Sequence, residues 1–290
     1  MALLVVGGLA LAFGRGLFTR RADVRDVGPY AAGTRTVQAG DLTFEIWYPA
    51  PLTSSEALVR YEQAHLGYVA RNAPVADAPP RPLVVLSHGY TASRLELAWL
   101  AERLAARGVV SIAIDHADAA REMDGALACE RAKKARAAID AALADPTIRA
   151  KIAGERVVAV GHSFGGTTAL ALAGARVRGQ AGCDDPRVRG VVATAPPLAP
   201  FDLQGPPAAP SPVIFAGTSD SLVAGADAVA ARWPGARVVR VPDAGHFVFK
   251  GVCTPYATAR MPVVCKDAAT VRRRAVHDDV AAAVLALLGD

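Results

Sequence analysis

The sequence predicts an α/β protein in which a mainly parallel central sheet is covered by helices on both faces. Short apolar segments rich in β-branched residues alternate along the chain with longer segments of helical periodicity. Continuous apolar strands of this kind are typical of parallel sheets, because both faces of such sheets are buried. Polar residues and glycines also follow most of the apolar segments. Right-handed crossovers would bring these polar strand ends to one edge of the sheet.

Composition favours one large folded domain. The chain has 290 residues, of which 52% are hydrophobic, and this excludes a chain that is disordered throughout. Its net charge is +5, but the basic residues are scattered and are not interleaved with aromatic residues. Nucleic acid is therefore not an expected partner. Because no linker or internal repeat interrupts the pattern, we expect a single domain over residues 30–290.

The N-terminus carries an apolar segment from Ala2 to Phe13, and Arg15, Arg20 and Arg21 follow it. The segment is too short to span a bilayer comfortably, and a secretory signal would carry its positive charges before the apolar residues. We predict that residues 1–29 form a signal-like or anchor segment, with a short arm packed on the domain as the alternative. This predicts an exported protein, periplasmic, secreted or membrane-anchored, that could associate weakly with membranes. A cytoplasmic location is the alternative.

The first half of the domain is predicted to alternate strands and helices. Residues 42–48 alternate apolar and polar side chains, which predicts a half-exposed strand that ends at Pro49. The polar, proline-containing residues 50–81 are predicted to be irregular. Next come a buried strand over 82–87, a helix over 95–107 with leucines on one face, and a buried strand over 109–114.

The second half continues the alternation. The alanine-rich residues 126–144 are predicted to form a helix, and Asp145-Pro146 is expected to end it. The remaining predicted elements are strands over 156–160, 190–194, 212–216 and 236–241, a helix from Gly166 to Ala173, and a closing helix over 276–288.

The turn between the strand over 156–160 and the following helix reads Gly161-His162-Ser163-Phe164-Gly165 and matches G-x-S-x-G. In this context the pattern is typical of a nucleophile elbow, which exposes the serine hydroxyl near the N-terminus of a helix. Gly161 and Gly165 are expected to be required, because a Cβ atom at either position would crowd the neighbouring backbone. Ser163 is therefore the predicted nucleophile, and a structural turn with a capping serine is the alternative.

A serine nucleophile needs a base and an acid. His246 lies in a loop between the last strand and the closing helix, and Asp220 directly follows the strand over 212–216. The chain order of Ser163, Asp220 and His246 is the order expected for a serine, acid and histidine on this type of sheet. Asp243 is the competing acid, but it lies too close in sequence to His246 to reach around its ring, and Asp115 is expected to be structural. The competing histidines are less well placed along the chain than His246; they are His65, His88, His116, His162 and His277.

Negative charge on a substrate carbonyl oxygen would need two backbone donors. The amide of Phe164 follows from the elbow itself. The amide of Tyr90 is the second predicted donor, because it lies in the loop after the buried strand over 82–87. We therefore predict an oxyanion hole formed by Tyr90 and Phe164.

Four cysteines are present, and two of them, Cys253 and Cys265, lie twelve positions apart in a loop-like segment. That spacing suits a local disulfide that would brace the loop carrying His246. Cys129 and Cys183 are predicted to form a second pair, with reduced buried thiols as the alternative for both. Paired C-x-x-C spacings are absent, so no metal site is expected, and no cofactor is expected either. Disulfides would require an oxidising compartment.

Together these residues resemble the α/β-hydrolase fold. More narrowly, the chain resembles bacterial dienelactone-hydrolase-like and platelet-activating-factor-acetylhydrolase-like esterases and cutinase-like polyester hydrolases. The matching segments are Ile46-Trp47-Tyr48-Pro49, Ser87-His88-Gly89-Tyr90-Thr91, Ile114-Asp115-His116, Gly161-His162-Ser163-Phe164-Gly165-Gly166, Gly217 with Asp220, and Gly245-His246-Phe247. The resemblance implies a serine carboxylic-ester hydrolase that forms an acyl-enzyme and takes a small-molecule or polymeric ester as substrate.

Two departures from these families narrow the expected substrate. Polyester hydrolases typically carry a tryptophan after the Ala-Pro pair, where this chain has Pro197, and dienelactone hydrolases proper use cysteine as nucleophile. The segment between Thr194 and Val213 is short and proline-rich, so no large lid domain is expected. We therefore expect an open cleft for short- to medium-chain acyl esters. The alternatives are a polyester hydrolase, an acyltransferase or haloperoxidase with the same triad, and an inactive binding protein of this fold.

Overall fold

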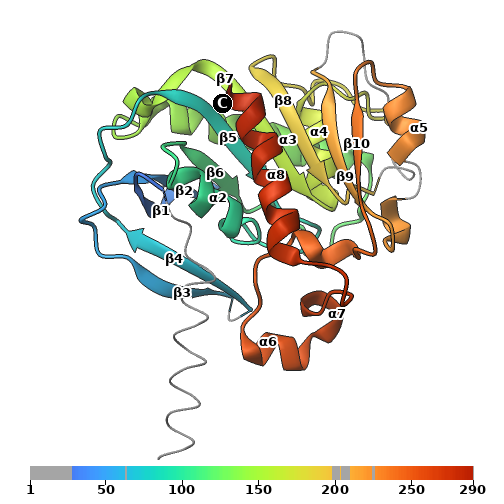
Figure 1. The fold of residues 1–290 in the computed structure, drawn as a ribbon. Coiled ribbons are helices and arrows are strands. Elements are labelled where there is room, and N and C mark those ends of the chain that lie inside the picture. Colours follow the sequence, from blue (N-terminus) through green and yellow to red (C-terminus); the bar gives the residue numbers. More distant parts are fainter. Residues whose placement is uncertain (1–27, 63, 198–202, 204–209, 224–225, 290) are drawn as a thin grey trace, which may run out of the picture.

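The computed structural model describes residues 28–62, 64–197, 203, 210–223 and 226–289. Within these residues, ten strands form one sheet in the order β10-β9-β8-β7-β5-β6-β2-β1-β4-β3 (Figure 1). The strands are β1 (Ala31–Ala39), β2 (Leu42–Ala50), β3 (Ala57–Tyr61), β4 (His65–Arg71), β5 (Arg81–Ser87), β6 (Ser111–Ile114), β7 (Ile152–His162), β8 (Val188–Thr194), β9 (Pro212–Gly217) and β10 (Arg237–Val241). The six strands from β5 to β10 run parallel to one another, which confirms the predicted mainly parallel sheet.

Helices cover both faces of this sheet. They are α2 (Ala98–Ala105), α3 (Gly125–Ala144), α4 (Phe164–Leu172), α5 (Ala226–Ala231), α6 (Pro255–Arg260), α7 (Pro262–Cys265) and α8 (Arg273–Leu288), with 3-10 turns η1 (Arg149–Lys151), η3 (Ser221–Val223) and η4 (His246–Phe249). Helices α2 and α8 pack on one face, and α3 and α4 pack on the other (Figure 1). The apolar side chains of the central strands are therefore buried between two helical layers.

The first predicted strand differs from expectation in its burial. Strand β2 covers the predicted residues 42–48, but most of its side chains are buried on both faces. It is buried because it lies between two other strands, pairing antiparallel with β1 and with β6. The prediction of a half-exposed strand is therefore wrong, since it did not include β1 as a neighbour.

The prediction that residues 50–81 are irregular is also wrong. Strands β3 and β4 form an antiparallel hairpin there, and β4 extends the main sheet by pairing parallel with β1. The prolines lie outside both strands, so they interrupt no ladder of hydrogen bonds. Leu66, Val69 and Ala70 of β4 are buried in the fold.

The carboxyl ends of the parallel strands carry the predicted site residues. Strand β5 is followed by the loop at Gly89, β7 by Ser163, β9 by Asp220 and β10 by the turn at His246. Because these strands run in the same direction, the four segments meet at one edge of the sheet. In the described part of the chain, no helix has the length and apolar character needed to cross a membrane. The predicted signal-like or anchor segment lies outside the described residues, apart from its last two positions.

Candidate active site

Ser163 occupies a strained backbone conformation at the turn from β7 to α4. Its φ is 52° and its ψ is −129°, a combination that L-amino acids rarely adopt. The turn is held by the Ser163 amide, which donates to the Thr194 carbonyl at 2.8 Å, and by the Gly166 amide, which donates to the Ser163 carbonyl at 2.7 Å. These bonds fix the backbone that presents the hydroxyl group.

The two glycines of the elbow have no room for a side chain. A Cβ atom on Gly161 would lie 2.0 Å from the carbonyl oxygen of Gly165. A Cβ atom on Gly165 would lie 2.0 Å from the carbonyl oxygen of Ser87, in the neighbouring strand. Both obstacles are backbone atoms, so glycine is required at these positions by close approach rather than by a positive φ.

Ser163, His246 and Asp220 form one hydrogen-bonded series. His246 Nε2 lies 2.9 Å from Ser163 Oγ, and His246 Nδ1 lies 2.7 Å from Asp220 Oδ2. Because the carboxylate accepts, Nδ1 carries the proton and Nε2 presents its lone pair to the serine hydroxyl. The Leu222 amide donates to Asp220 Oδ1 at 3.0 Å and fixes the other carboxylate oxygen.

The loop after β5 lies directly against the elbow. A Cβ atom built on Gly89 would be 3.4 Å from the Cβ atom of Ser163. The rings of Tyr90 and Phe164 meet edge to face, with centroids 6.1 Å apart. The two residues predicted to supply oxyanion donors are therefore neighbours in space.

The competing histidines lie in structural positions. His116 Nε2 is hydrogen-bonded to Ser87 Oγ at 2.9 Å, and the His116 amide donates to His88 Nε2 at 3.1 Å. Burial, aided by the Arg131 cation, lowers the pKa of both imidazoles. His65 is buried beside Cys253, with its Nδ1 3.9 Å from the sulfur atom. Within the described part of the chain, these three imidazoles are bonded to residues other than Ser163.

The two competing acids are also bound elsewhere. Asp115 pairs with Arg94, whose amide donates to Asp115 Oδ1 at 2.8 Å. Asp243 accepts from Thr270 Oγ1 at 2.8 Å, on the exposed side of the loop that leads to His246. Asp220 is thus the acid that contacts His246 among the described residues.

His162 and Glu96 form a buried contact for which the sequence gives no direct prediction. The His162 side chain contacts the loop of the proposed base, since its Nε2 donates to the His246 carbonyl at 3.1 Å. Its Nδ1 lies 3.3 Å from Glu96 Oε2, and both side chains are almost fully buried. In the sequence, Glu96 lies four positions before Leu100 and therefore on the apolar face of the helix predicted over 95–107. A charged residue on an apolar face is unusual, and this could have indicated that Glu96 is buried.

The loop that begins at His246 is held from two helices. Trp99 Nε1 of α2 donates to the Phe249 carbonyl at 2.9 Å. His277 Nε2 of α8 donates to the carbonyls of Val248 and Lys250, each at 3.1 Å. Burial, followed by the charges of Arg273 and Arg103, lowers the pKa of His277 to about 3. His277 is therefore an uncharged structural support for the loop.

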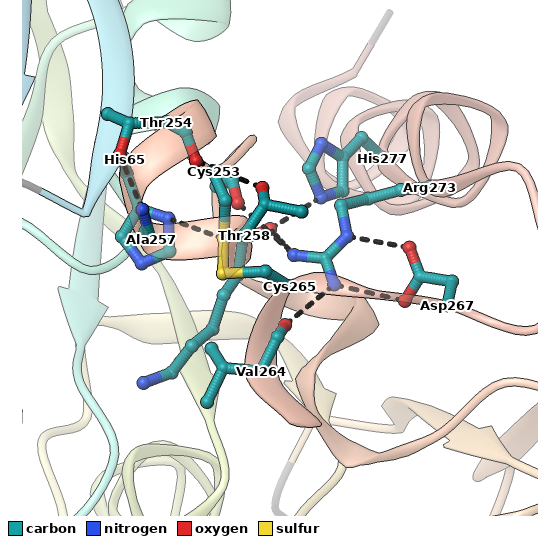
Figure 2. Close-up of a disulfide and its surroundings, with 12 residues drawn as sticks. His65, Cys253, Thr254, Ala257, Thr258, Val264, Cys265, Asp267, Arg273 and His277 are labelled. Carbon is teal, nitrogen blue, oxygen red and sulfur yellow. Dashed lines mark hydrogen bonds and ion pairs between the residues drawn. A yellow bond between two sulfur atoms is a disulfide. The ribbon is translucent and has the colours of Figure 1, made fainter. Parts of the chain in front are cut away.

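The structure contains both predicted disulfides, Cys129–Cys183 and Cys253–Cys265. Figure 2 shows the second one, which joins the segment just before α6 to the end of α7 beside His65. Arg273 lies next to it and donates to the Val264 carbonyl at 2.9 Å and to the Lys250 carbonyl at 3.2 Å. The disulfide and Arg273 thereby connect the α6–α7 segment with the end of the loop that carries His246.

Comparison with known proteins relates the chain to ester hydrolases. A model of the family described as PET hydrolase-like matches residues 71–232, which is more than half of the chain. Cutinase est1 of Thermobifida alba is 38% identical over 95 residues, covering 32% of this chain and 30% of that protein. Cutinase 2 of Thermobifida cellulosilytica is 37% identical over 95 residues, covering 32% and 34%. The match therefore spans about a third of the length of these curated relatives.

A solved structure shows the fold over almost the whole chain. The ferulic acid esterase from Streptomyces cinnamoneus superposes with a TM-score of 0.70 and covers 91% of both chains. Sequence identity between the two is 21%. The likeness establishes the α/β-hydrolase fold that the sequence motifs predict.

Proposed function

Because the chain belongs to the PET hydrolase-like family, we propose that it is a serine carboxylic-ester hydrolase that works through an acyl-enzyme. The observation that carries the proposal is the series from Asp220 through His246 to Ser163, with contacts of 2.7 and 2.9 Å. Relatives named as cutinases support it. An inactive binding protein would have no need of this arrangement around a strained serine.

Acylation follows from the proton positions in this series. Ser163 Oγ attacks the ester carbonyl carbon while His246 Nε2 takes the hydroxyl proton. Asp220 holds the other ring nitrogen, so the imidazole keeps the orientation needed to accept that proton and is stabilised once charged. The same proton then passes to the oxygen of the leaving alcohol, and the acyl group remains on Ser163.

Deacylation repeats the sequence with water as the nucleophile. His246 removes a proton from water as the water oxygen attacks the acyl carbon. It then returns that proton to Ser163 Oγ as the bond between Oγ and the acyl carbon breaks, which releases the acid and restores the free serine. Both steps place negative charge on the substrate carbonyl oxygen. The amides of Phe164 and Tyr90 are assigned to bind that oxygen, and each such donor contributes roughly 3 kcal/mol of transition-state stabilisation.

Short- to medium-chain acyl esters are the proposed substrates, because the segments around the site include no large lid domain among the described residues. A polyester is the second candidate, and it is favoured by the family and by the cutinase relatives. Pro197 stands where polyester hydrolases typically carry tryptophan, which places simple esters first. The two disulfides support an exported protein, since such bonds persist in oxidising compartments.

The test is hydrolysis of a series of p-nitrophenyl esters of increasing acyl length by the wild type and by Ser163→Ala. We expect activity in the wild type and a loss of several orders of magnitude in the variant. A fluorophosphonate probe should label Ser163, and labelling at Ser87 or Ser219 would redirect the assignment. Wild-type protein that is folded and cleaves none of the esters would contradict the proposal.

Two further assays separate the alternatives. Release of soluble products from a polyester film distinguishes a polyester hydrolase from an enzyme restricted to small esters. Product analysis with added alcohol or peroxide distinguishes hydrolysis from acyl transfer or haloperoxidase chemistry. In both assays Ser163→Ala is the blank.

A further inference from the structure

We propose that Glu96 is a positioning residue for the oxyanion hole, holding the His88–Gly89 peptide together with Arg131 on its opposite side. Glu96 Oε2 accepts from the Gly89 amide, and the Arg131 guanidinium donates to the His88 carbonyl. The proposal rests on the serine-esterase function argued above. It gives a role to the buried Glu96 carboxylate, which is part of neither the elbow nor the triad.

The Glu96 contact fixes the amide side of the peptide. The Gly89 amide lies 2.6 Å from Glu96 Oε2, and Glu96 is only 3% exposed. A hydrogen bond to an ionised carboxylate is about twice as strong as one between neutral groups. A Cβ atom at Gly89 would lie 3.4 Å from both Glu96 oxygens and from the Ser163 Cβ atom. Gly89 is therefore close to both the carboxylate and the proposed nucleophile.

The Arg131 contacts fix the carbonyl side. Arg131 is fully buried, and besides the His88 carbonyl its guanidinium reaches the Gly89 carbonyl at 3.5 Å. The Gly89 carbonyl also accepts from His88 Nδ1 at 2.6 Å. In a trans peptide the N–H and C=O groups point in opposite directions. Holding the Gly89 carbonyl toward the buried Arg131 therefore turns the Tyr90 amide away from the core, to the side where substrate would bind.

Glu96 also connects this loop with the other two loops of the site. Its Oε2 lies 3.3 Å from His162 Nδ1 in the elbow, and its Oε1 lies 2.8 Å from Lys250 Nζ in the loop that begins at His246. One carboxylate thus contacts the segments that carry the oxyanion donor, the nucleophile and the base. Burial opposes its ionisation, but His162 and Lys250 outweigh burial and keep the pKa of Glu96 well below its usual value.

Glu96→Gln tests the proposal, with Glu102→Gln as the matched control. Glu102 lies on α2, which begins two positions after Glu96; it is also 3% exposed, and it binds the Tyr61 hydroxyl and the Tyr68 amide. We expect Glu96→Gln to lower kcat for a p-nitrophenyl ester by about 10- to 100-fold. A loss of this size corresponds to a displacement of the Tyr90 amide by up to about 1 Å. KM should change less than about twofold, and Glu96→Asp, which keeps the charge, should recover part of the rate.

Thermal unfolding separates this role from general support of the fold. Both glutamine variants remove a buried carboxylate, so both should lower Tm, but only Glu96→Gln should lower kcat. Wild-type kcat in Glu96→Gln would overturn the proposal. An equal loss of kcat in Glu102→Gln would also overturn it, because the loss would then reflect structural damage alone.

Hydrogen exchange gives a readout that does not depend on ester hydrolysis. We expect faster exchange in peptides covering residues 88–95 and 246–250 of Glu96→Gln, and no such change in Glu102→Gln. Unchanged exchange at both segments would refute the positioning role even if the wild type proved not to be an esterase. If Glu96→Gln does not fold, Glu96→Asp supplies the same two measurements, with an intermediate loss of kcat expected.

Discussion

The imidazole of His277 stacks on the indole of Trp99, with ring centroids 3.7 Å apart and an angle of 11° between the planes. Both rings donate to carbonyl oxygens of the loop that begins at His246. The proposed base is therefore held by a pair of aromatic donors from α2 and α8. This contact makes the stability of the site depend on His277 remaining uncharged.

Stability should fall as the solution is acidified below neutrality. Burial lowers the pKa of His277 to about 3 and that of His65 to about 4, whereas an unfolded histidine titrates near ~6.5. Below about pH 6.5 the unfolded chain therefore binds more protons than the native chain. The contribution of these two histidines to the free energy of unfolding is complete above about pH 6.5 and is lost as pH falls toward the native pKa values. We expect Tm to decrease between pH 7.5 and pH 5, with a smaller decrease in His277→Gln. A wild-type Tm that stays constant over that range would contradict the assignment.

Asp220→Asn should reduce kcat by about 10⁴-fold while the protein remains folded. An asparagine in this place can donate to His246 Nδ1 and so favours the tautomer that leaves no lone pair toward Ser163. Asp243→Asn is the matched control, since Asp243 lies on the same loop as His246 and bonds to Thr270. Steady-state kinetics on purified variants would check this. A greater loss in Asp243→Asn would transfer the role of the acid to Asp243.

Gly161→Ala and Gly165→Ala should each lower Tm strongly or prevent accumulation of folded protein. The new Cβ atom would meet backbone oxygens at 2.0 Å, and backbone in the central strands cannot move aside cheaply. Gly245→Ala is the control for stability, because nothing lies within 4 Å of a Cβ atom at that position. Thermal melts would report the difference. Equal stability of all three variants would show that the elbow is looser than the contacts indicate.

Graded reduction should open Cys253–Cys265 before Cys129–Cys183. Cys253 and Cys265 are partly exposed, whereas Cys129 and Cys183 are 1% and 5% exposed. In the chain-entropy model the loop of 12 residues contributes about 3 kcal/mol to stability. Alkylation of free thiols followed by peptide mapping would give the order of opening, and melts would give the loss of Tm. Earlier labelling of Cys129 or Cys183 would reverse the expected order.

The central fold could be predicted because it depends on local patterns. The apolar strand over 156–160, the elbow at Ser163 and the helix after it form one continuous signal in the sequence. Asp220 and His246 follow strands that are themselves apolar and short, so their place at the sheet edge follows from topology. These predictions required no knowledge of side-chain contacts.

Features that depend on distant contacts could not be predicted. The hairpin of β3 and β4 is stabilised through partners such as β1, which lies far away in sequence. Glu96 is a polar residue near the start of a helix, and only the structure brings it to Gly89, His162 and Lys250. Such a residue is usually exposed, so its burial was not foreseen.

At position 163, stability of the fold and the proposed chemistry favour different residues. Glycine would adopt a φ of 52° without steric cost, whereas a serine held there costs on the order of 1–3 kcal/mol. A lineage that no longer needed a nucleophile would gain stability by drifting to glycine at position 163. The proposed nucleophile is therefore held at a cost in stability that glycine at the same position would not carry.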